Sequence, residues 1–420
     1  MKFTISLYAS ICLFLFIGCT SKPKQQEVQT NEDISQNNDA KVLEEFPNTD
    51  TTLQVIPPIK VTPKKTKPTD NDIQYNITYK GKNNIVKAVD IFKNIQYVPL
   101  ETNDKSLLAS LLTVVICKNG YIYINDVRAS GPYIHLFDLN GKFIRDIGKE
   151  GEGPEEYITC LSMCVSDNGW VSVTDRGSYS IITYDTEGNF ISRIPLKTSP
   201  YNVVYLNDSL LLHKGHYDYD GDKYYVINMY KGEIVNSFYP NKFRMFQSYL
   251  RQNLTAYEGK AIVAEYTNNE ILEVTKDGYK VRYIINVNDK MPPKGFWDQK
   301  VKDFTELTTE ESTKGYISHI PCFTENERKM FLYFRGDDRE ETEGWALIDK
   351  ETKKFQTFKR IALSDKLIIS PDFFYTQSDG RFTFILSPEE ILNSGDEAFI
   401  SQFPGLKEDD NPILMFAELK

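Results

Sequence analysis

The stretch IGKEGEGPEEY, residues 147–157, has a composition that could hold a phosphate group, with glycines at 148, 151 and 153 beside Lys149. A phosphate loop needs a strand before it and a helix after it, so that free N–H groups and the helix dipole face the anion. Here ITCLSMCVS follows and reads as a strand, and the glutamates of the loop would repel an anion. Pro154 also matches Pro200 in a later copy of the same unit. The stretch is therefore predicted to be a turn between two strands.

A second segment carries the side chains that metal ions prefer. Its histidines and aspartates lie close together in HKGHYDYDGD: His213, His216, Asp218, Asp220 and Asp222. The spacing departs from a calcium-binding EF-hand loop, because Gly221 stands one place early and Met229 occupies the place of the final glutamate. We prefer a solvated loop between two strands. The residues kept as metal candidates are His216, Asp218, Asp220 and Asp222, with Ca²⁺ as the ion.

Arginine and aspartate also recur together at the ends of predicted strands. The pairs are Asp126 with Arg128, Asp175 with Arg176, and Asp337 with Arg335. Arg binds carboxylates with two parallel hydrogen bonds, so these residues could hold an anionic peptide or sugar. The alternative, which we favour, is that they form salt bridges at strand corners. The sequence has no GxSxG motif, and we assign no catalytic residues.

The N-terminal residues have the pattern of a targeting signal. An apolar run after Met1-Lys2 is too short to span a membrane, and it ends in LFIGC at residues 15–19. This resembles a bacterial lipobox with Cys19 as the lipidated residue, although Phe16 replaces the usual Leu. We expect residues 1–18 to be a lipoprotein signal peptide. Residues 19–73 are polar and poor in large apolar side chains, so we expect a disordered tether.

Composition favours strands in the remaining chain. Aromatic residues make up 13% of the sequence, and such side chains pack well on pleated surfaces. The net charge is −10, which argues against a broad electrostatic attraction to nucleic acid. Cys160 and Cys164 would lie about 13 Å apart on one strand, too far to bridge each other. We expect buried free thiols there and at Cys117 and Cys322, with a disulfide between neighbouring strands left open.

An internal repeat then sets the architecture. NGYIYIND at 119–126 matches NGWVSVTD at 168–175, and FDLNGKFIR at 137–145 matches YDTEGNFIS at 184–192. Weaker copies of the turn follow near residues 230, 277 and 351. A four-stranded unit with this period is the signature of a β-propeller blade. Five blades are expected at 108–147, 158–194, 202–239, 254–287 and 316–360. A sixth would combine FFYTQ, RFTFIL and NPILMFAEL with the strand at 95–102, so that N-terminal and C-terminal strands close the ring.

Three segments carry a family resemblance: YVPLET at 97–102, LFDLNGKFIRDIGKEGEGPEEY at 136–157 and NPILMFAELK at 411–420. Over residues 90–420 the chain resembles the six-bladed β-propeller lipoproteins of Bacteroidetes, relatives of NHL-repeat propellers. The resemblance implies an all-β, six-bladed propeller of four-stranded antiparallel blades over residues 74–420. It implies little about activity. An insertion at 288–315, with a short helix expected near Phe304, could be a lid, a partner contact or a cap on the core.

These expectations lead to a function. In propellers, the crossings between blades and the loops between second and third strands surround one mouth of the channel, where a ligand would bind. The candidate residues at this mouth are Asp126, Arg128, Glu155, Glu156, Tyr157, Asp175, Arg176, Tyr201, Arg335 and Asp337. We expect a lipoprotein of the outer or inner membrane of a Gram-negative envelope, facing the periplasm, with the cell surface as the alternative. It would recognise a peptide, glycan or protein partner without a cofactor. The alternative is a metal-dependent envelope hydrolase of the propeller lactonase kind.

Overall fold

A computed structural model describes the fold of this chain. The chain is divided into two units, and the second of them, Pro58–Lys420, is compact. The described residues all belong to the second unit: 73–80, 84–109, 112–128, 131–197, 200–215, 221–240, 254–257, 259–264, 269–288, 290–291, 315–336, 341–369 and 374–420. Cys19, the tether and the helix expected in the 288–315 insertion lie outside them. Within the described part, no helix has the length and apolar character needed to cross a membrane.

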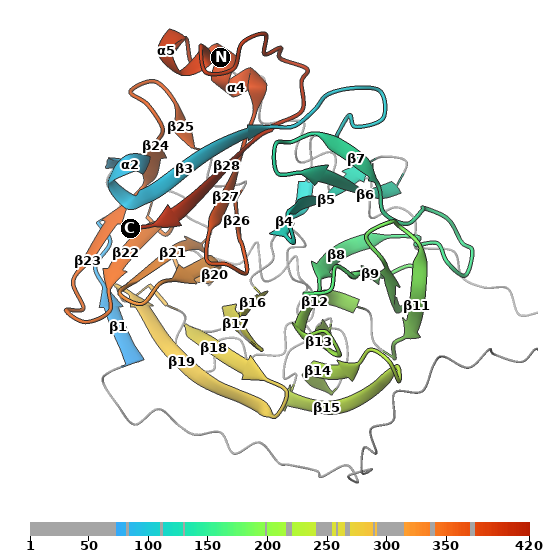
Figure 1. Cartoon of the computed structure of the whole chain (residues 1–420). Helices are drawn as coiled ribbons and strands as arrows, with labels where there is room; N and C mark the ends of the chain where they lie inside the picture. Colours follow the sequence, from blue (N-terminus) through green and yellow to red (C-terminus); the bar gives the residue numbers. More distant parts are fainter. Residues whose placement is uncertain are drawn as a thin grey trace, which may run out of the picture. The chain divides into compact units, whose positions relative to one another are not determined.

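Strands dominate the described part of the unit and form seven sheets. Three four-stranded sheets come first in the chain: β4 (Leu112–Lys118) to β7 (Phe143–Asp146), β8 (Cys160–Val165) to β11 (Phe190–Pro195), and β12 (Pro200–Asn207) to β15 (Glu233–Pro240). Their middle strands are β5 (Tyr121–Arg128), β6 (Gly131–Asp138), β9 (Val171–Asp175), β10 (Ser180–Tyr184), β13 (Leu210–Gly215) and β14 (Asp222–Asn228). In each sheet, consecutive strands pair in antiparallel order, as expected for blades (Figure 1).

The next sheets follow the same plan with additions. A five-stranded sheet contains β16 (Leu254–Tyr257), β17 (Lys260–Ala264), β18 (Glu270–Thr275) and β19 (Gly278–Val287), with β1 (Gln74–Ile77) on its outer edge. A four-stranded sheet contains β20 (Ile317–Glu325), β21 (Lys329–Gly336), β22 (Gly344–Asp349) and β23 (Phe355–Phe358). Another joins β26 (Phe374–Thr376), β27 (Phe382–Leu386) and β28 (Ile413–Leu419) to β3 (Phe92–Pro99). The smallest joins β2 (Ile85–Lys87), β24 (Arg360–Ala362) and β25 (Ile368–Ile369).

The predicted propeller is confirmed, but the predicted count of six is wrong, because the described residues form seven sheets, none of which closes on itself. The sheet that the sequence did not reveal is β2–β24–β25. Its strands have only two or three residues, too few to leave an alternating pattern. The sequence also missed three short helices: α2 (Ala88–Ile91), α4 (Pro388–Asn393) and α5 (Glu397–Ile400).

The predicted hairpin turns are present. In the β6–β7 turn, the carboxylate of Asp138 accepts hydrogen bonds from the backbone N–H groups of Asn140 and Lys142. Gly141 has φ +83°, and a Cβ there would lie 2.1 Å from the carbonyl oxygen of Pro99. Only glycine fits this position, because the turn requires positive φ and β3 passes directly over it.

The pairing of N-terminal and C-terminal strands is also present. β28 runs antiparallel to β3, with Met415 opposite Tyr97. The described residues 74–80 and 84–99 contain β1, β2 and β3, which pair with strands of neighbouring sheets, and we call these residues the outer belt. β1 pairs in parallel with β19, and β2 pairs in parallel with β24. Between them, Asn84 Nδ2 donates to the carbonyl oxygen of Thr357 on β23 at 2.6 Å.

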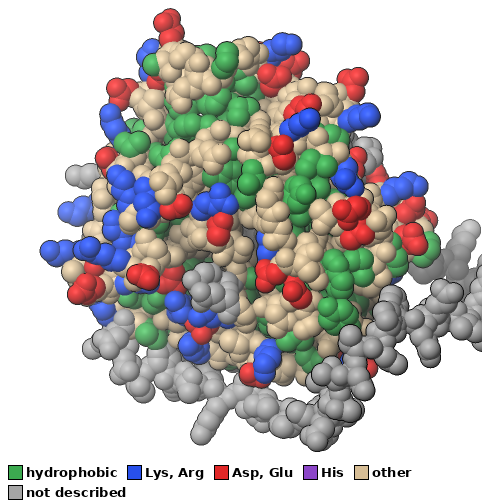
Figure 2. All heavy atoms as spheres, viewed as in Figure 1, with side chains coloured by type: hydrophobic (Ala, Val, Ile, Leu, Met, Phe, Trp, Pro, Cys, Tyr) green, Lys and Arg blue, Asp and Glu red, His purple; other side chains and the backbone are tan. Residues whose placement is uncertain are grey.

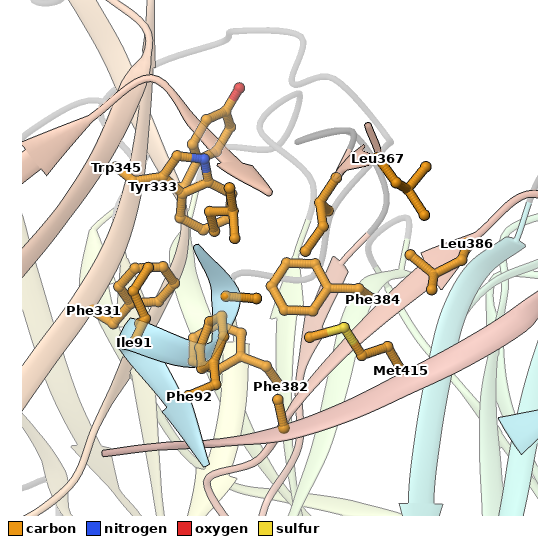
Figure 3. Close-up of a cluster of buried hydrophobic side chains, with 14 of the residues drawn as sticks. Ile91, Phe92, Phe331, Tyr333, Trp345, Leu367, Phe382, Phe384, Leu386 and Met415 are labelled. Atoms are coloured by element: carbon orange, nitrogen blue, oxygen red, sulfur yellow. The ribbon is translucent and has the colours of Figure 1, made fainter. Parts of the chain in front are cut away.

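Clusters of buried apolar side chains lie between neighbouring sheets and fix their packing. One of them joins the belt to the last strands of the chain (Figure 3). The ring of Phe92 lies 5.5 Å from that of Phe382 and 5.7 Å from that of Phe384. Burying one such phenylalanine contributes about 1.5–3 kcal/mol. The four cysteines at 117, 160, 164 and 322 are buried and free, as the sequence favoured.

Candidate functional site at the channel mouth

The candidate mouth is built from segments that leave the second strand of a sheet or enter the first. In an antiparallel sheet these segments lie at the same end. Asp126 stands near the end of β5, and Asp175 ends β9. The stretch 147–157 runs from the outer strand β7 to the inner strand β8, which confirms the predicted turn.

The Asp175 carboxylate is fully buried and holds the loop that enters β8. It accepts hydrogen bonds from the backbone N–H groups of Ile158 at 3.2 Å and Thr159 at 2.9 Å. It also accepts from the N–H of Gly177 at 3.0 Å and from Ser178 Oγ at 2.6 Å. A buried carboxylate is stable only when such donors replace water. Asp175 therefore clamps both the entering loop and the β9–β10 turn.

Asp126 performs the same task in the preceding sheet. Its Oδ2 accepts a 2.8 Å hydrogen bond from the N–H of Ala109, which lies 17 residues upstream, the same separation as between Ile158 and Asp175. His135 Nε2 lies 3.8 Å from Asp126 Oδ2, and His135 Nδ1 lies 2.7 Å from Asp146 Oδ1. The repeated aspartates thus mark a repeated loop clamp beneath the mouth.

The loop 147–158 is held just as firmly. Glu156 Oε1 accepts from Lys149 Nζ at 2.9 Å and Oε2 from the N–H of Gly153 at 3.0 Å. The Lys149 hydrogen bond, more than the Gly153 one, lowers the pKa of Glu156. Arg193 on β11 donates to the carbonyl oxygens of Pro154 and Glu156, which ties the loop to the next sheet. The arrangement stabilises a turn, and its carbonyl oxygens face a cation rather than an anion.

Two predicted tyrosines lie below the surface. Tyr157 is buried with its ring edge-to-face against Tyr184, 6.2 Å between centroids, and burial raises its pKa. Tyr201 is also buried, and its carbonyl oxygen accepts from Thr174 Oγ1 at 3.5 Å. Glu155 is exposed, whereas Arg176 and Arg335 are half-buried. Together with Glu156, whose side chain is 26% exposed, these residues are the described candidates whose side chains reach solvent.

Several candidates lie outside the described residues. They are His216, Asp218, Asp220 and Asp337, together with the side chain of Arg128. Asp222 begins β14, and its Oδ2 accepts from Ser237 Oγ at 2.7 Å. Among the residues that the structure describes, no three His, Cys, Asp or Glu side chains converge as metal ligands would.

A series of polar side chains just inside the mouth was not predicted from the sequence. The inner strands β4, β8, β12 and β20 each carry a register shift near their first residues. Such a bulge frees a backbone carbonyl, which needs a donor. Asn125 Nδ2 donates to the carbonyl of Cys160 in the next sheet at 2.9 Å, and Thr174 Oγ1 reaches that of Tyr201. The signal was present in the sequence, because each donor directly precedes a repeated aspartate.

Charged side chains of both signs lie on the face of the molecule that Figure 2 shows. On the face shown in Figure 2, acidic and basic side chains are interspersed over the surface, with apolar side chains between them. Such a surface gives no large field of one sign to steer a ligand.

Two solved structures and one family description are similar to this chain. The chain is similar to a putative exported protein from Bacteroides fragilis at 19% identity and TM-score 0.66, covering 83% of this chain and 99% of that one. It is similar to a DUF4221 family member from Bacteroides vulgatus at 11% identity and TM-score 0.44, covering 81% and 99%. No curated protein matches. Residues 72–418 match the family described as "Domain of unknown function (DUF4934)", and the chain belongs to that family.

Proposed function

We propose that this chain is an envelope-anchored lipoprotein that serves as a binding or scaffold module and recognises a peptide, glycan or protein partner at the channel mouth. Cys19 would carry the lipid, and residues 19–73 would hold the propeller away from the membrane. The similarity to an exported protein is consistent with an envelope location.

One observation carries the proposal: the loops of the mouth are pre-organised. Asp126 and Asp175 hold the loops that enter β4 and β8, and Arg193 holds the loop at 147–158. A rigid rim lowers the entropy lost when a partner binds. We therefore assign the two aspartates and Tyr157 to positioning the loops. Glu155, Arg176 and Arg335 are the residues we expect to contact a partner.

The metal-dependent hydrolase is the second candidate. It would need several carboxylates from different sheets directed at one ion. The two carboxylates that recur in the sequence accept hydrogen bonds from their own loops instead. This use of Asp126 and Asp175 favours binding over hydrolysis.

Site-specific photo-cross-linking in cells tests the binding proposal. A photoreactive amino acid replaces Glu155 in the full chain, and a matched variant carries it at Glu187, which is exposed in the β10–β11 turn at the other end. We expect a discrete adduct from position 155 and none from position 187. Equal adducts from both positions, or none from 155, would contradict binding at the mouth.

The anchor has its own test. Cells grown with a labelled fatty acid should incorporate the label into the full chain but not into the Cys19→Ser variant, which keeps the size of the side chain. Label retained in the variant would reject Cys19 as the lipidated residue.

A further inference from the structure

The outer edge of β15 is open in the described structure. Each sheet of the fold has an outer strand, and β15 pairs with β14 alone among the described strands. An open edge presents unpaired backbone N–H and C=O groups that can bind another strand. In the next sheet, the corresponding strand β19 has its outer edge covered by β1.

Apolar side chains are unusually exposed along β15. Tyr230 in the turn before it is 65% exposed, and Ile234 and Val235 are 50% and 48% exposed. By register, Ile234 occupies the place of Phe143 in β7 and Phe190 in β11. Those two side chains pack against core clusters, whereas Ile234 and Val235 do not. A patch of this kind on a soluble domain marks a contact surface.

The patch continues onto the preceding sheet. Trp170, which follows the β8–β9 turn, lies edge-on to Tyr230 with 5.7 Å between ring centroids. On the other side, Asn236 Nδ2 donates to the carbonyl of Lys276 at 2.9 Å and holds β15 against the β18–β19 turn. The strand is therefore held in place by contacts with both neighbouring sheets, while the side chains of Ile234 and Val235 remain in solvent.

The chain itself shows what such an edge accepts. β1 is added to β19 in parallel, and its residues alternate between buried and less buried positions. Tyr75, Ile77 and Tyr79 enter the core cluster beneath β19 and β21. Gln74, the first residue of β1, is polar, and its side chain is only partly buried. Strand addition by a segment with alternating apolar and polar residues is therefore already used by this fold.

We propose that the outer edge of β15 binds an extended segment of a partner protein, in which apolar and polar residues alternate, as an additional parallel strand. Ile234 and Val235 would contact its apolar side chains, and the Trp170–Tyr230 pair would hold a further apolar residue at one end. The surface is separate from the channel mouth, so the two proposals can fail independently.

Hydrogen exchange on the full chain tests the proposal with a defined probe. The probe is a capped peptide with the sequence of residues 74–80, QYNITYK, which this fold binds as a parallel outer strand, and it is added up to about 1 mM. We expect the amides of residues 233–240 to exchange about threefold more slowly with the peptide than without it. A peptide of the same composition with the alternation removed should have no effect.

Variants make the test specific. Val235→Lys should abolish the slowing, whereas Leu139→Lys, at an exposed apolar residue of the β6–β7 turn, should leave it intact. Unchanged exchange of β15 with peptide, or equal slowing in Val235→Lys, would overturn the proposal. So would faster exchange at Ile284–Val287, which would mean that the peptide displaces β1. Dimers that form without peptide and slow the exchange of β15 would show that a second copy of this chain binds the edge, and would overturn the proposal of a partner protein.

Discussion

At the scale of single residues, the repeated aspartates are best understood as loop clamps. Asp175→Ala removes the acceptor of two loop N–H groups, the Gly177 N–H and the Ser178 hydroxyl. Leaving such donors unpaired should lower the free energy of unfolding by about 2–4 kcal/mol. Asp167→Ala is the matched control, because the Asp167 side chain is 75% exposed and its ion pair with Lys118 contributes at most about 1 kcal/mol. Urea unfolding measures the loss of unfolding free energy in each variant. Equal losses would contradict the clamp.

His213 is a single residue that makes the stability of the fold depend on pH. It is buried and stacked on Tyr225, and burial lowers its pKa to about 4 from the ordinary value of 6.5. Because the folded-state pKa is the lower one, the unfolded chain binds the proton first as pH falls. The contribution of neutral His213 to the free energy of unfolding is therefore complete above pH 6.5. It decreases by about 3 kcal/mol as the pH falls to 4. Urea unfolding of His213→Leu should lose that part of the pH slope. A variant with the wild-type slope between these pH values would contradict the assignment.

At the scale of elements, Arg193 connects β11 to the loop at 147–158. Arg193→Met keeps the aliphatic stem but removes the hydrogen bonds to Pro154 and Glu156. We expect the amides of residues 150–157 to exchange about tenfold faster, because the loop loses its main tie to the next sheet. Arg145→Met in β7 is the control, since Arg145 is exposed and its described contact is a single 3.5 Å hydrogen bond to Glu187. Faster exchange in both variants would show that the loop is held by other contacts.

The outer belt is the second element with a testable role. Ile77 is 2% exposed and packs into the cluster beneath β19 and β21, so Ile77→Ala should cost about 2–4 kcal/mol of unfolding free energy. Ile85, in β2 of the same belt, is 51% exposed, and Ile85→Ala should cost less than about 0.5 kcal/mol. Chemical unfolding of both variants measures the difference. Similar small losses would mean that the belt contributes little to the propeller.

At the scale of the whole molecule, the repeat was sufficient to predict the propeller. Turn residues such as Asn119-Gly120 and alternating strands recur with a regular period, and that period follows from local chemistry. The count of sheets failed because β2 and β24 are too short to alternate and pair only through the belt, a long-range contact. The positions of Asp126 and Asp175 near the ends of strands could be predicted, but their role could not. Asp175 looks the same in sequence whether it binds a ligand or a loop N–H, and only the contacts distinguish the two.

The central claim is that the repeated buried carboxylates position the loops of a binding module instead of holding a catalytic metal. Metal content and thermal melting of the full chain, purified without chelator, test it together with Asp175→Asn. We predict no stoichiometric metal, a melting temperature that Ca²⁺ and chelator leave unchanged, and a lower melting temperature for the variant under both conditions. Stoichiometric metal that raises the melting temperature of the wild type and is lost in Asp175→Asn would contradict the claim.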